Sequence, residues 1–518
     1  MIVQDAQQDW ISETCHWLGN SSAQDIPELV LAGLRDTDGA ELETLLNVVS
    51  ANFDQLRFHP HRLRQLMQQF AARLVSIVRE SPPEFAIIAP DILVRLSEML
   101  AEVDQIASAH CLQMLAVQHD EESIDALAAQ LAESPPEQLS AVGIALSPLW
   151  QLEGSQLELF FDRLDDGFIQ PATMAALLDL ANYATRKGRL TTHPFEDRLK
   201  DLSGLLANLT QRLVAMEEDP KQFGNDVESI QKVLNESVSL TVSLCDALGL
   251  IGDTTAIARL NQALALSHRR VQTEAAGALA RLGDLGGREK LIALAEDRVA
   301  RLRSVSYAEE LGFADAIDEE YRLPSALAEA ELASWLSAGD RFGVAPQEME
   351  LIDSRTIYWP SYSEPKDCFL FRYTYQFPGG QLSNIGIVGP LTSAFNADLA
   401  NLPTEDIYAV FAGWQAEHDD IYEIPEQLLN MDQRREADRL VHSLEQLDFE
   451  LKHILALTFF FSEIALLATV ATGNKLLNAV TDGTELLTYP VSDQPTGITA
   501  DLVLAIFRGR KLLRTFNH

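Results

Sequence analysis

The chain has 518 residues, of which 47% are hydrophobic, so it can bury a sizeable core and is not disordered as a whole. Its 77 acidic residues outnumber its 39 basic residues, which makes the formal net charge −38 at pH 7. Because phosphates repel carboxylates, this charge disfavours nucleic acid and anionic membranes as partners and favours a basic partner; the alternative is that the acidity only maintains solubility.

The start of the chain and its cysteines indicate the compartment. Residues 1–5 contain no basic stretch followed by an apolar run, so no secretory signal is expected. The four cysteines, Cys15, Cys111, Cys245 and Cys368, lie far apart and form no Cys-x-x-Cys pair. This spacing favours buried, reduced thiols over a disulfide framework or a zinc site. We therefore expect a cytoplasmic protein.

Residues 1–235 show a helical pattern, with apolar residues recurring at spacings of three and four. Residues 81–84 and 134–137 both read Ser-Pro-Pro-Glu, which offers a serine cap, a proline for the first turn and a glutamate for a capping box. We therefore expect a helix to begin at each of them. Their spacing is not matched elsewhere, so the region is predicted to be an irregular helical array.

A repeated phrase lies within the next region, residues 236–335. Ala-Leu-Gly-Leu-Ile-Gly-Asp at 247–253 returns 31 residues later as Ala-Leu-Ala-Arg-Leu-Gly-Asp at 278–284. The leading alanines allow close helix packing, and Gly252 and Gly283 can take the left-handed conformation that ends a helix. The aspartate after each glycine can cap the following helix.

The phrase resembles HEAT-like repeats of the type named after phycobilisome lyases, in which a second helix with this ending is followed by a helix beginning near Ala-x-x-x-Leu. The first copy supplies Ala256 and Leu260, whereas the second copy has Gly287 in place of the alanine. The resemblance implies a mainly α fold, an α-solenoid of HEAT-like helical pairs. Such solenoids mostly present surfaces to partners, and the resemblance specifies no chemistry.

The period changes near residue 340, and a small α+β unit with an antiparallel sheet, inserted in or appended to the solenoid, is predicted over residues 340–424. Strands are expected at 351–359, 369–377 and 383–388, with turn residues at 378–380. The middle strand alternates aromatic and other residues, which predicts one apolar face. Two helices should follow Pro390, the second covering one face of the sheet with Ile407, Val410, Phe411 and Trp414.

Residues 425–518 are predicted to be a C-terminal helical segment with one short hairpin near residues 482–489. The run 454–472 has about the length of a membrane-spanning helix, but Glu463 near its middle would be costly in lipid. We therefore predict a buried helix there and no membrane anchor. A last helix over 499–516 carries several cations, which suit a helix C-terminus.

Motifs for common chemistries are absent from the sequence: there is no phosphate-binding loop, nucleophile elbow, zinc-binding His-Glu-x-x-His or dinucleotide fingerprint. The segment from Trp414 to Glu423 gathers Glu417, His418 and Asp420, donors that could hold a divalent cation or act as an acid–base pair. The alternative, a solvated helix end on an acidic surface, is favoured. We therefore predict no catalytic, metal or cofactor residue.

Candidates for partner binding come from two regions, the α+β unit at 340–424 and the basic window at 269–303. Aromatic residues concentrate in the α+β unit, where they could form an interface or simply fill the core. Residues 269–303 are locally basic, and their arginines could contact a partner or pair between repeats. The candidate partner-binding residues are Trp359, Arg372, Tyr373, Tyr375, Trp414, Glu417, His418, Arg269, Arg270 and Arg301.

The repeat and the missing catalytic motifs together favour a non-enzymatic scaffold or adaptor that binds a protein partner. One alternative is a bilin-lyase-like or chaperone-like enzyme for chromophore attachment, which only the resemblance of the repeats suggests. A second alternative is nucleic-acid binding through a basic concave face, carried by the window 269–303. Partner identity and oligomeric state do not follow from the sequence.

Overall fold

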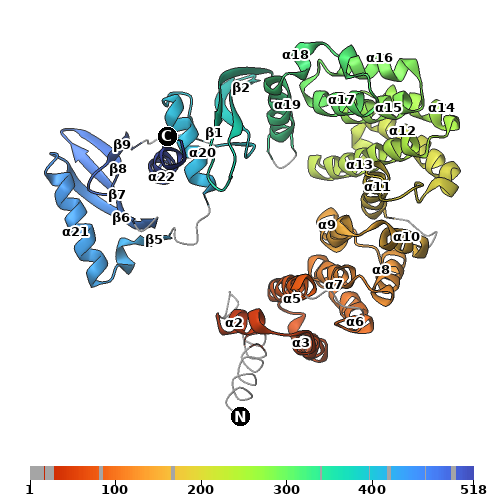
Figure 1. The fold of residues 1–518 in the computed structure, drawn as a ribbon, viewed down its shortest axis with the longest axis horizontal. Helices are drawn as coiled ribbons and strands as arrows, with labels where there is room; N and C mark the ends of the chain where they lie inside the picture. The colour runs from red at the N-terminus through yellow and green to blue at the C-terminus, as the bar shows by residue number, and fades with distance from the viewer. Residues whose placement is uncertain are drawn as a thin grey trace. The chain divides into compact units, whose positions relative to one another are not determined.

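The computed structural model describes residues 14, 17, 28–80, 86–164, 170–338, 341–395, 397–416, 422–460, 463–491 and 497–517. Over these residues the chain is mainly helical, with two small antiparallel sheets near its C-terminal end (Figure 1). The chain divides into two compact units, Met1–Leu291 and Ile292–His518.

The first unit is helical throughout its described residues, as expected. Its helices are α2 (Glu28–Asp36), α3 (Gly39–Ala51), α4 (Phe53–Leu56), α5 (Pro60–Glu80), α6 (Pro90–Ala101), α7 (Gln105–Gln118), α8 (Glu121–Glu133), α9 (Leu139–Leu146), α10 (Gly154–Arg163), α11 (Pro171–Arg186), α12 (Leu199–Glu218), α13 (Val227–Ile251), α14 (Ile257–Leu264), α15 (Arg269–Arg281) and α16 (Leu285–Leu294), the last of which crosses into the second unit.

These helices pack on their neighbours in the chain. α5, α7, α9, α11, α13 and α15 contact one another in succession, while α6, α8 and α10, and then α12 and α14, pack beside that row. One continuous apolar core runs through the unit. α13 is long and apolar enough to cross a membrane by length and composition, yet it packs on α11, α12 and α15 as a core helix does.

The repeated phrase ends its helices as the sequence predicts. Gly252 and Gly283 both have a positive φ, 82° and 84°. Asp253 then accepts a hydrogen bond from the amide of Thr255, and the equivalent aspartate of the second copy caps the helix that follows it. At Gly249 an added Cβ would lie 2.8 Å from the Cα of Ala278, so the small residues of the phrase let α13 and α15 pack closely.

One predicted helix start is wrong. Ser134 ends α8, and α9 begins only at Leu139, without a capping box. The amides of Glu137 and Gln138 instead bind the side chain of Gln105, a tertiary contact that the local motif does not reveal. The similar start at residues 81–84 lies outside the described residues.

The second unit combines helices with the two sheets. Its helices after α16 are α17 (Arg298–Glu310), α18 (Glu319–Arg322), α19 (Pro324–Leu336), α20 (Thr404–Gln415), α21 (Met431–Glu445) and α22 (Ala500–Phe516). Its strands are β1 (Glu348–Ile357), β2 (Lys366–Phe377), β3 (Gly380–Val388), β4 (Ser393–Ala394), β5 (Tyr422–Pro425), β6 (Glu450–Phe460), β7 (Glu463–Thr472), β8 (Lys475–Thr481) and β9 (Leu486–Pro490).

The first sheet has the antiparallel order β1-β2-β3-β4, and its three long strands match the prediction. The prediction of a single apolar face is wrong, because both faces are covered. Phe371, Tyr373 and Tyr375 pack under α19, while Cys368 and Leu370 pack on the opposite face with α20. The described part of residues 391–403 contains the short strand β4 and turns, so only one of the two expected helices is present.

The second sheet, in the order β5-β6-β7-β8-β9, corrects the prediction of a C-terminal helical segment: between α21 and α22 the described chain forms the strands β6 to β9. The run 454–472 belongs to two paired strands, with Phe460 opposite Glu463, and is not a helix. Its apolar residues are continuous because both faces of β6 and β7 are buried, which removes the period that distinguishes a strand. The hairpin near residue 482 and the last helix are confirmed.

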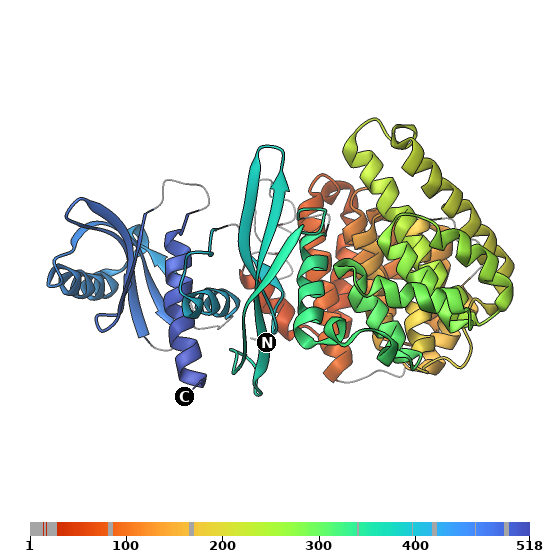
Figure 2. The ribbon, with the colours of Figure 1, turned by 90° about the horizontal axis from the view of Figure 1, so that it is seen from above.

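The second unit contains the same arrangement twice. A helix, four antiparallel strands and a closing helix occur as α19, β1 to β4 and α20, and again as α21, β6 to β9 and α22. In each copy the first helix covers one face of its sheet, and the closing helix shares a core with its counterpart. In the view from above, the two closing helices lie between the two sheets (Figure 2).

The two closing helices meet through matching small residues. Ala409-Val-Phe-Ala-Gly413 of α20 corresponds to Ala505-Ile-Phe-Arg-Gly509 of α22. An added Cβ at Gly413 would lie 1.9 Å from the carbonyl oxygen of Ala505, and one at Gly509 would lie 1.7 Å from that of Ala409. The contact is therefore reciprocal, and the two helix backbones touch where the glycines lie.

Candidate functional site

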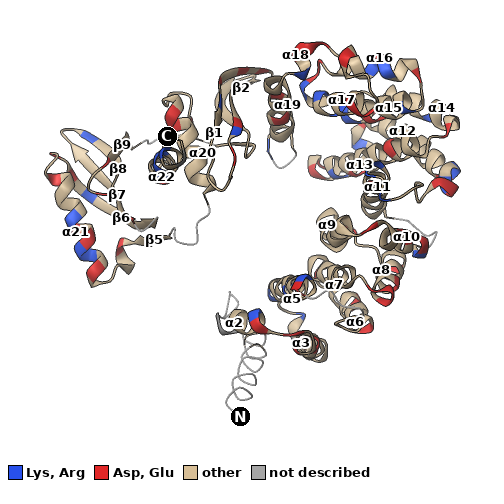
Figure 3. Cartoon of the chain, in the orientation of Figure 1, with Lys and Arg blue, Asp and Glu red and all other residues tan. Residues whose placement is uncertain are grey.

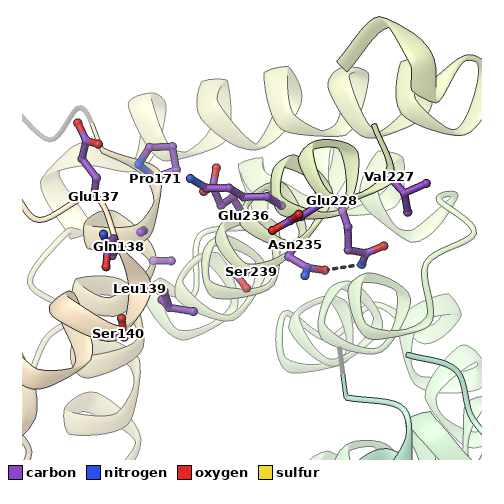
Figure 4. Close-up of a pocket in the computed structure, with 14 residues that line it drawn as sticks. Glu137, Gln138, Leu139, Ser140, Pro171, Val227, Glu228, Asn235, Glu236 and Ser239 are labelled. Atoms are coloured by element: carbon purple, nitrogen blue, oxygen red, sulfur yellow. Dashed lines mark hydrogen bonds between the residues drawn. The ribbon is translucent and has the colours of Figure 1, made fainter. Parts of the chain in front are cut away.

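A pocket of about 770 Å³ opens in the first unit, where the N-terminal ends of α9, α11 and α13 converge (Figure 4). We call it the α9/α11/α13 groove. Its lining residues are Glu137, Gln138, Leu139, Ser140, Pro171, Ala172, Ala175, Val227, Glu228, Gln231, Lys232, Asn235, Glu236 and Ser239. Three helices that follow one another in the packed row thus contribute to a single concavity.

Contacts at the helix starts hold the groove together. The Thr173 hydroxyl donates to the carbonyl oxygen of Pro136 at 3.0 Å, which ties α11 to the segment before α9. Asp226 caps α13 by accepting hydrogen bonds from the amide and the hydroxyl of Ser229, and these bonds lower the pKa of Asp226. On the α13 wall, the Gln231 side chain donates to that of Asn235, as Figure 4 shows.

The groove exposes large apolar side chains. Leu139 is 64% exposed and Val227 is 81% exposed, and each is the first residue of its helix. Pro171 adds further apolar surface beside the buried Ala172 and Ala175. Exposed apolar surface gathered in a concavity is typical of a binding site, whereas single exposed apolar residues are common on any surface.

The charged lining of the groove is mainly acidic. It contains Glu137, Glu228 and Glu236 against one cation, Lys232. Within the described part of the chain, none of these three carboxylates forms an ion pair. Acidic and basic residues elsewhere often lie together, as along α21, where Arg435 pairs with Asp432 (Figure 3).

A further carboxylate lies one helical turn beyond the groove lining. Asp179 follows Ala175 by four residues on α11 and lies near Ser243 of α13, whose hydroxyl donates to the carbonyl oxygen of Ser239. Asp179 keeps exposed surface, but the protein around it desolvates the carboxyl group and raises its pKa to about 6. Nearby, Asp246 is buried and pairs with Arg186.

A second pocket, of about 500 Å³, lies in the second unit between the start of α20 and the end of α22. Its charged groups pair with one another. Arg510 binds both carboxylate oxygens of the buried Asp406, at 2.6 and 2.8 Å, and Arg355 pairs with Asp353 and Glu405. These interactions fix the position of α20, and both arginines are paired with carboxylates.

The predicted aromatic candidates are mostly buried. Trp359, Tyr373 and Tyr375 are all less than 3% exposed. The indole of Trp359 donates to the side chain of Gln415, and the hydroxyl of Tyr375 donates to the carbonyl oxygen of Val344. Their placement agrees with the core alternative. Trp414 differs: it is 59% exposed and packs edge-on against Phe395.

The charged candidates are scattered. Arg301 is buried and pairs with Glu329, whereas Arg372 lies at the surface opposite Glu350. Arg269 and Arg270 are exposed at the start of α15. Glu417 and His418 lie outside the described residues.

The cations of the last helix do not form a free basic surface. Arg508 pairs with Glu423, Arg510 with Asp406 and Arg514 with Glu485. Lys511 contacts both Glu463 and Asp482. The helix therefore joins elements of the second unit through these four side chains.

Comparison with known proteins assigns no function. The chain matches no family model, no curated protein and no solved structure. The candidate site therefore depends on the geometry alone. Within the described residues, no group of three or more His, Cys, Asp or Glu side chains could hold a metal ion. Cys111, Cys245 and Cys368 are buried, and burial raises the pKa of the Cys111 thiol to about 12.

The sequence analysis missed the groove. Its residues come from three helix starts separated by long stretches of chain, and no motif links them. The available signal was an apolar residue at the first position of a helix, as with Leu139 and Val227, where polar residues are more common. That signal becomes informative only once the helices are seen to converge.

Proposed function

We propose that the chain is a non-enzymatic, cytoplasmic scaffold or adaptor that binds a protein partner in the α9/α11/α13 groove. The observation that carries the proposal is the groove itself, an exposed apolar concavity of about 770 Å³ bordered by carboxylates that have no ion-pair partner among the described residues. Leaving such surface uncovered is unfavourable in water, so coverage by a partner is the physical expectation.

We further propose that the helices form a HEAT-like solenoid. Three observations support it: the repeated phrase ends helices at Gly252 and Gly283, its small residues let α13 and α15 pack closely, and the helices contact their next and next-but-one neighbours. In a solenoid, binding surfaces form across successive repeats, and the groove spans three successive helices of one row.

The described charged groups favour binding over catalysis. In the second pocket, Arg510 and Arg355 are engaged by carboxylates, so their role is structural. The lining of the groove contains no histidine and no cysteine, and its one lysine forms no ion pair with a lining carboxylate. The lining therefore offers no general base placed beside a nucleophile. The nucleic-acid alternative loses support, because Arg298 and Arg301 of the basic window both bind Glu329. No observation favours the lyase alternative.

Site-specific photo-crosslinking tests the proposal. A crosslinking residue placed at 139 or 227 in the full chain should capture the same partner reproducibly in cells, and one placed at 285 should not. Leu285 is the matched control, because it is 72% exposed, begins its helix and lies outside the groove. The proposal is contradicted if positions 139 and 227 capture no partner, or if position 285 captures the same partner equally well.

A further inference from the structure

Resting on the proposed function, we propose a specific chemistry for the partner: a peptide segment in which an apolar side chain is flanked by lysine or arginine. Its apolar side chain would contact Leu139 and Pro171, a second apolar side chain could reach Val227 at the other end of the groove, and the cations would pair with the groove's carboxylates. The inference depends on three features of the groove, namely its apolar surface, its charge and its unused amides.

The apolar surface sets the size of what can bind. Leu139 and Val227 border the groove from two different helices, with Pro171 on the third, as the close-up shows. A volume of about 770 Å³ accommodates a few side chains but not a folded domain. The groove therefore fits an extended or helical segment that inserts one or two apolar side chains.

The charge of the groove selects the flanking residues. Three carboxylates face one ammonium group, and the described residues supply no further cation to these carboxylates. A basic segment would neutralise Glu137, Glu228 and Glu236, whereas an acidic segment would meet like charge. Asp179, one turn further along α11, could receive a long lysine or arginine side chain beyond the lining. The chain's net charge of −38 would also steer a basic segment towards it.

The start of α9 offers groups for the peptide main chain. Among the described residues no side chain caps this helix, because Gln138 at the cap position makes no such hydrogen bond. Its first-turn amides can donate to the carbonyl oxygens of a bound segment. Apolar contact, ion pairing and main-chain hydrogen bonding would then act at one place.

Binding of synthetic peptides to the full chain tests the inference. Three fluorescent peptides of equal length are compared by anisotropy: one with leucines flanked by lysines and arginines, one with the same leucines flanked by glutamates, and one with the cations kept and serines in place of the leucines. The first should bind at least about tenfold more tightly than either of the others, since it alone satisfies both features of the groove.

Charge reversal locates the binding. The double variant Glu228→Lys/Glu236→Lys should weaken binding of the leucine–cation peptide by about tenfold, the effect of losing two exposed ion pairs. The matched control, Glu122→Lys/Glu158→Lys, also reverses one charge in a first helical turn and one within a helix, both exposed and outside the groove. The control should bind normally, and circular dichroism should show both variants folded.

The outcomes separate this inference from the proposed function. Equal loss in the control would mean that only the overall charge attracts the peptide, and tighter binding of the glutamate peptide would reverse the assigned chemistry; either result overturns the inference. If no peptide binds while crosslinking from position 139 still captures a partner, the inference falls and the scaffold proposal stands. If both experiments fail, both proposals fall.

Discussion

Replacing Gly509 with alanine probes the helix crossing that joins the two halves of the second unit. An added Cβ at this position would lie 1.7 Å from the carbonyl oxygen of Ala409, far inside the distance at which such atoms normally pack. α20 and α22 would have to separate by about 1.5 Å, and a gap of that size removes most of the dispersion attraction between atoms that now touch.

The expected cost follows from two opposing effects. Overpacking a close contact costs about 3 kcal/mol when the surrounding structure cannot relax freely. Alanine regains about 1 kcal/mol, because it is a better helix former than glycine. The variant should therefore lose about 2 kcal/mol of unfolding free energy, and the loss should reach both sheets, since the shared core of α20 and α22 contains residues of each.

Chemical denaturation of the full chain, with hydrogen exchange to resolve α20 and α22, measures this effect. Gly204→Ala in α12 is the control, because an added Cβ there meets no atom within 4 Å. The control should stabilise the first unit by up to about 1 kcal/mol. If Gly509→Ala left the exchange of α20 and α22 unchanged while the control behaved as expected, the close crossing would be refuted.

Three further predictions concern ionisable groups. Burial lowers the pKa of His193 to about 4, so the stability that the neutral ring contributes is fully present above pH 6.5. Between pH 6.5 and pH 4 this stability falls by about 1.4 kcal/mol for each pH unit, because only the unfolded state takes up the proton. His193→Gln should flatten the plot of unfolding free energy against pH in this range. Desolvation raises the pKa of Asp179, so its ionisation opposes folding as the pH rises from about 4 to 6, and Asp179→Asn should gain stability relative to the parent at pH 7 but not at pH 4. Lys511→Met should cost about 2 kcal/mol in urea denaturation, because it removes the cation that contacts Glu463 and Asp482, and adding Asp482→Asn should recover part of that loss.

Local rules were sufficient where a residue acts on its own backbone. Gly252 and Gly283 could be predicted to end helices because a left-handed conformation favours glycine whatever lies around it. The strands at 369–377 and 383–388 could be predicted because alternation and a glycine-containing turn are also local signals. The scaffold interpretation of those features stays a prediction.

The failures occurred where a distant residue decides the structure. The run 454–472 has a helix-like composition, and Glu463 within it was weighed only against lipid. In the structure this glutamate begins β7 and contacts Lys511, which is 48 residues away in the chain. Neither the strand nor the pairing has a local signal, because a strand covered on both faces shows no alternation.

The candidate site was missed for the same reason. The aromatic residues of β2 attracted attention because they are close together in sequence, but α19 and the sheet bury Tyr373 and Tyr375. Leu139 and Val227 lie 88 positions apart, and each is unremarkable by itself. Their significance comes from the convergence of α9 and α13 at one pocket, which is a property of tertiary packing.

The charges of α22 and those of the groove differ in their pairing, and this difference indicates where a partner should be sought. In the second unit, Arg508, Arg510 and Lys511 all pair with carboxylates of that unit. A deletion of residues 340–424 would not test partner binding by the second unit. It would remove α20 and uncover the apolar face of α22, so a lost partner would indicate only misfolding. The groove in the first unit instead leaves its carboxylates unpaired among the described residues and its apolar side chains uncovered, so single substitutions there can remove binding without removing a core.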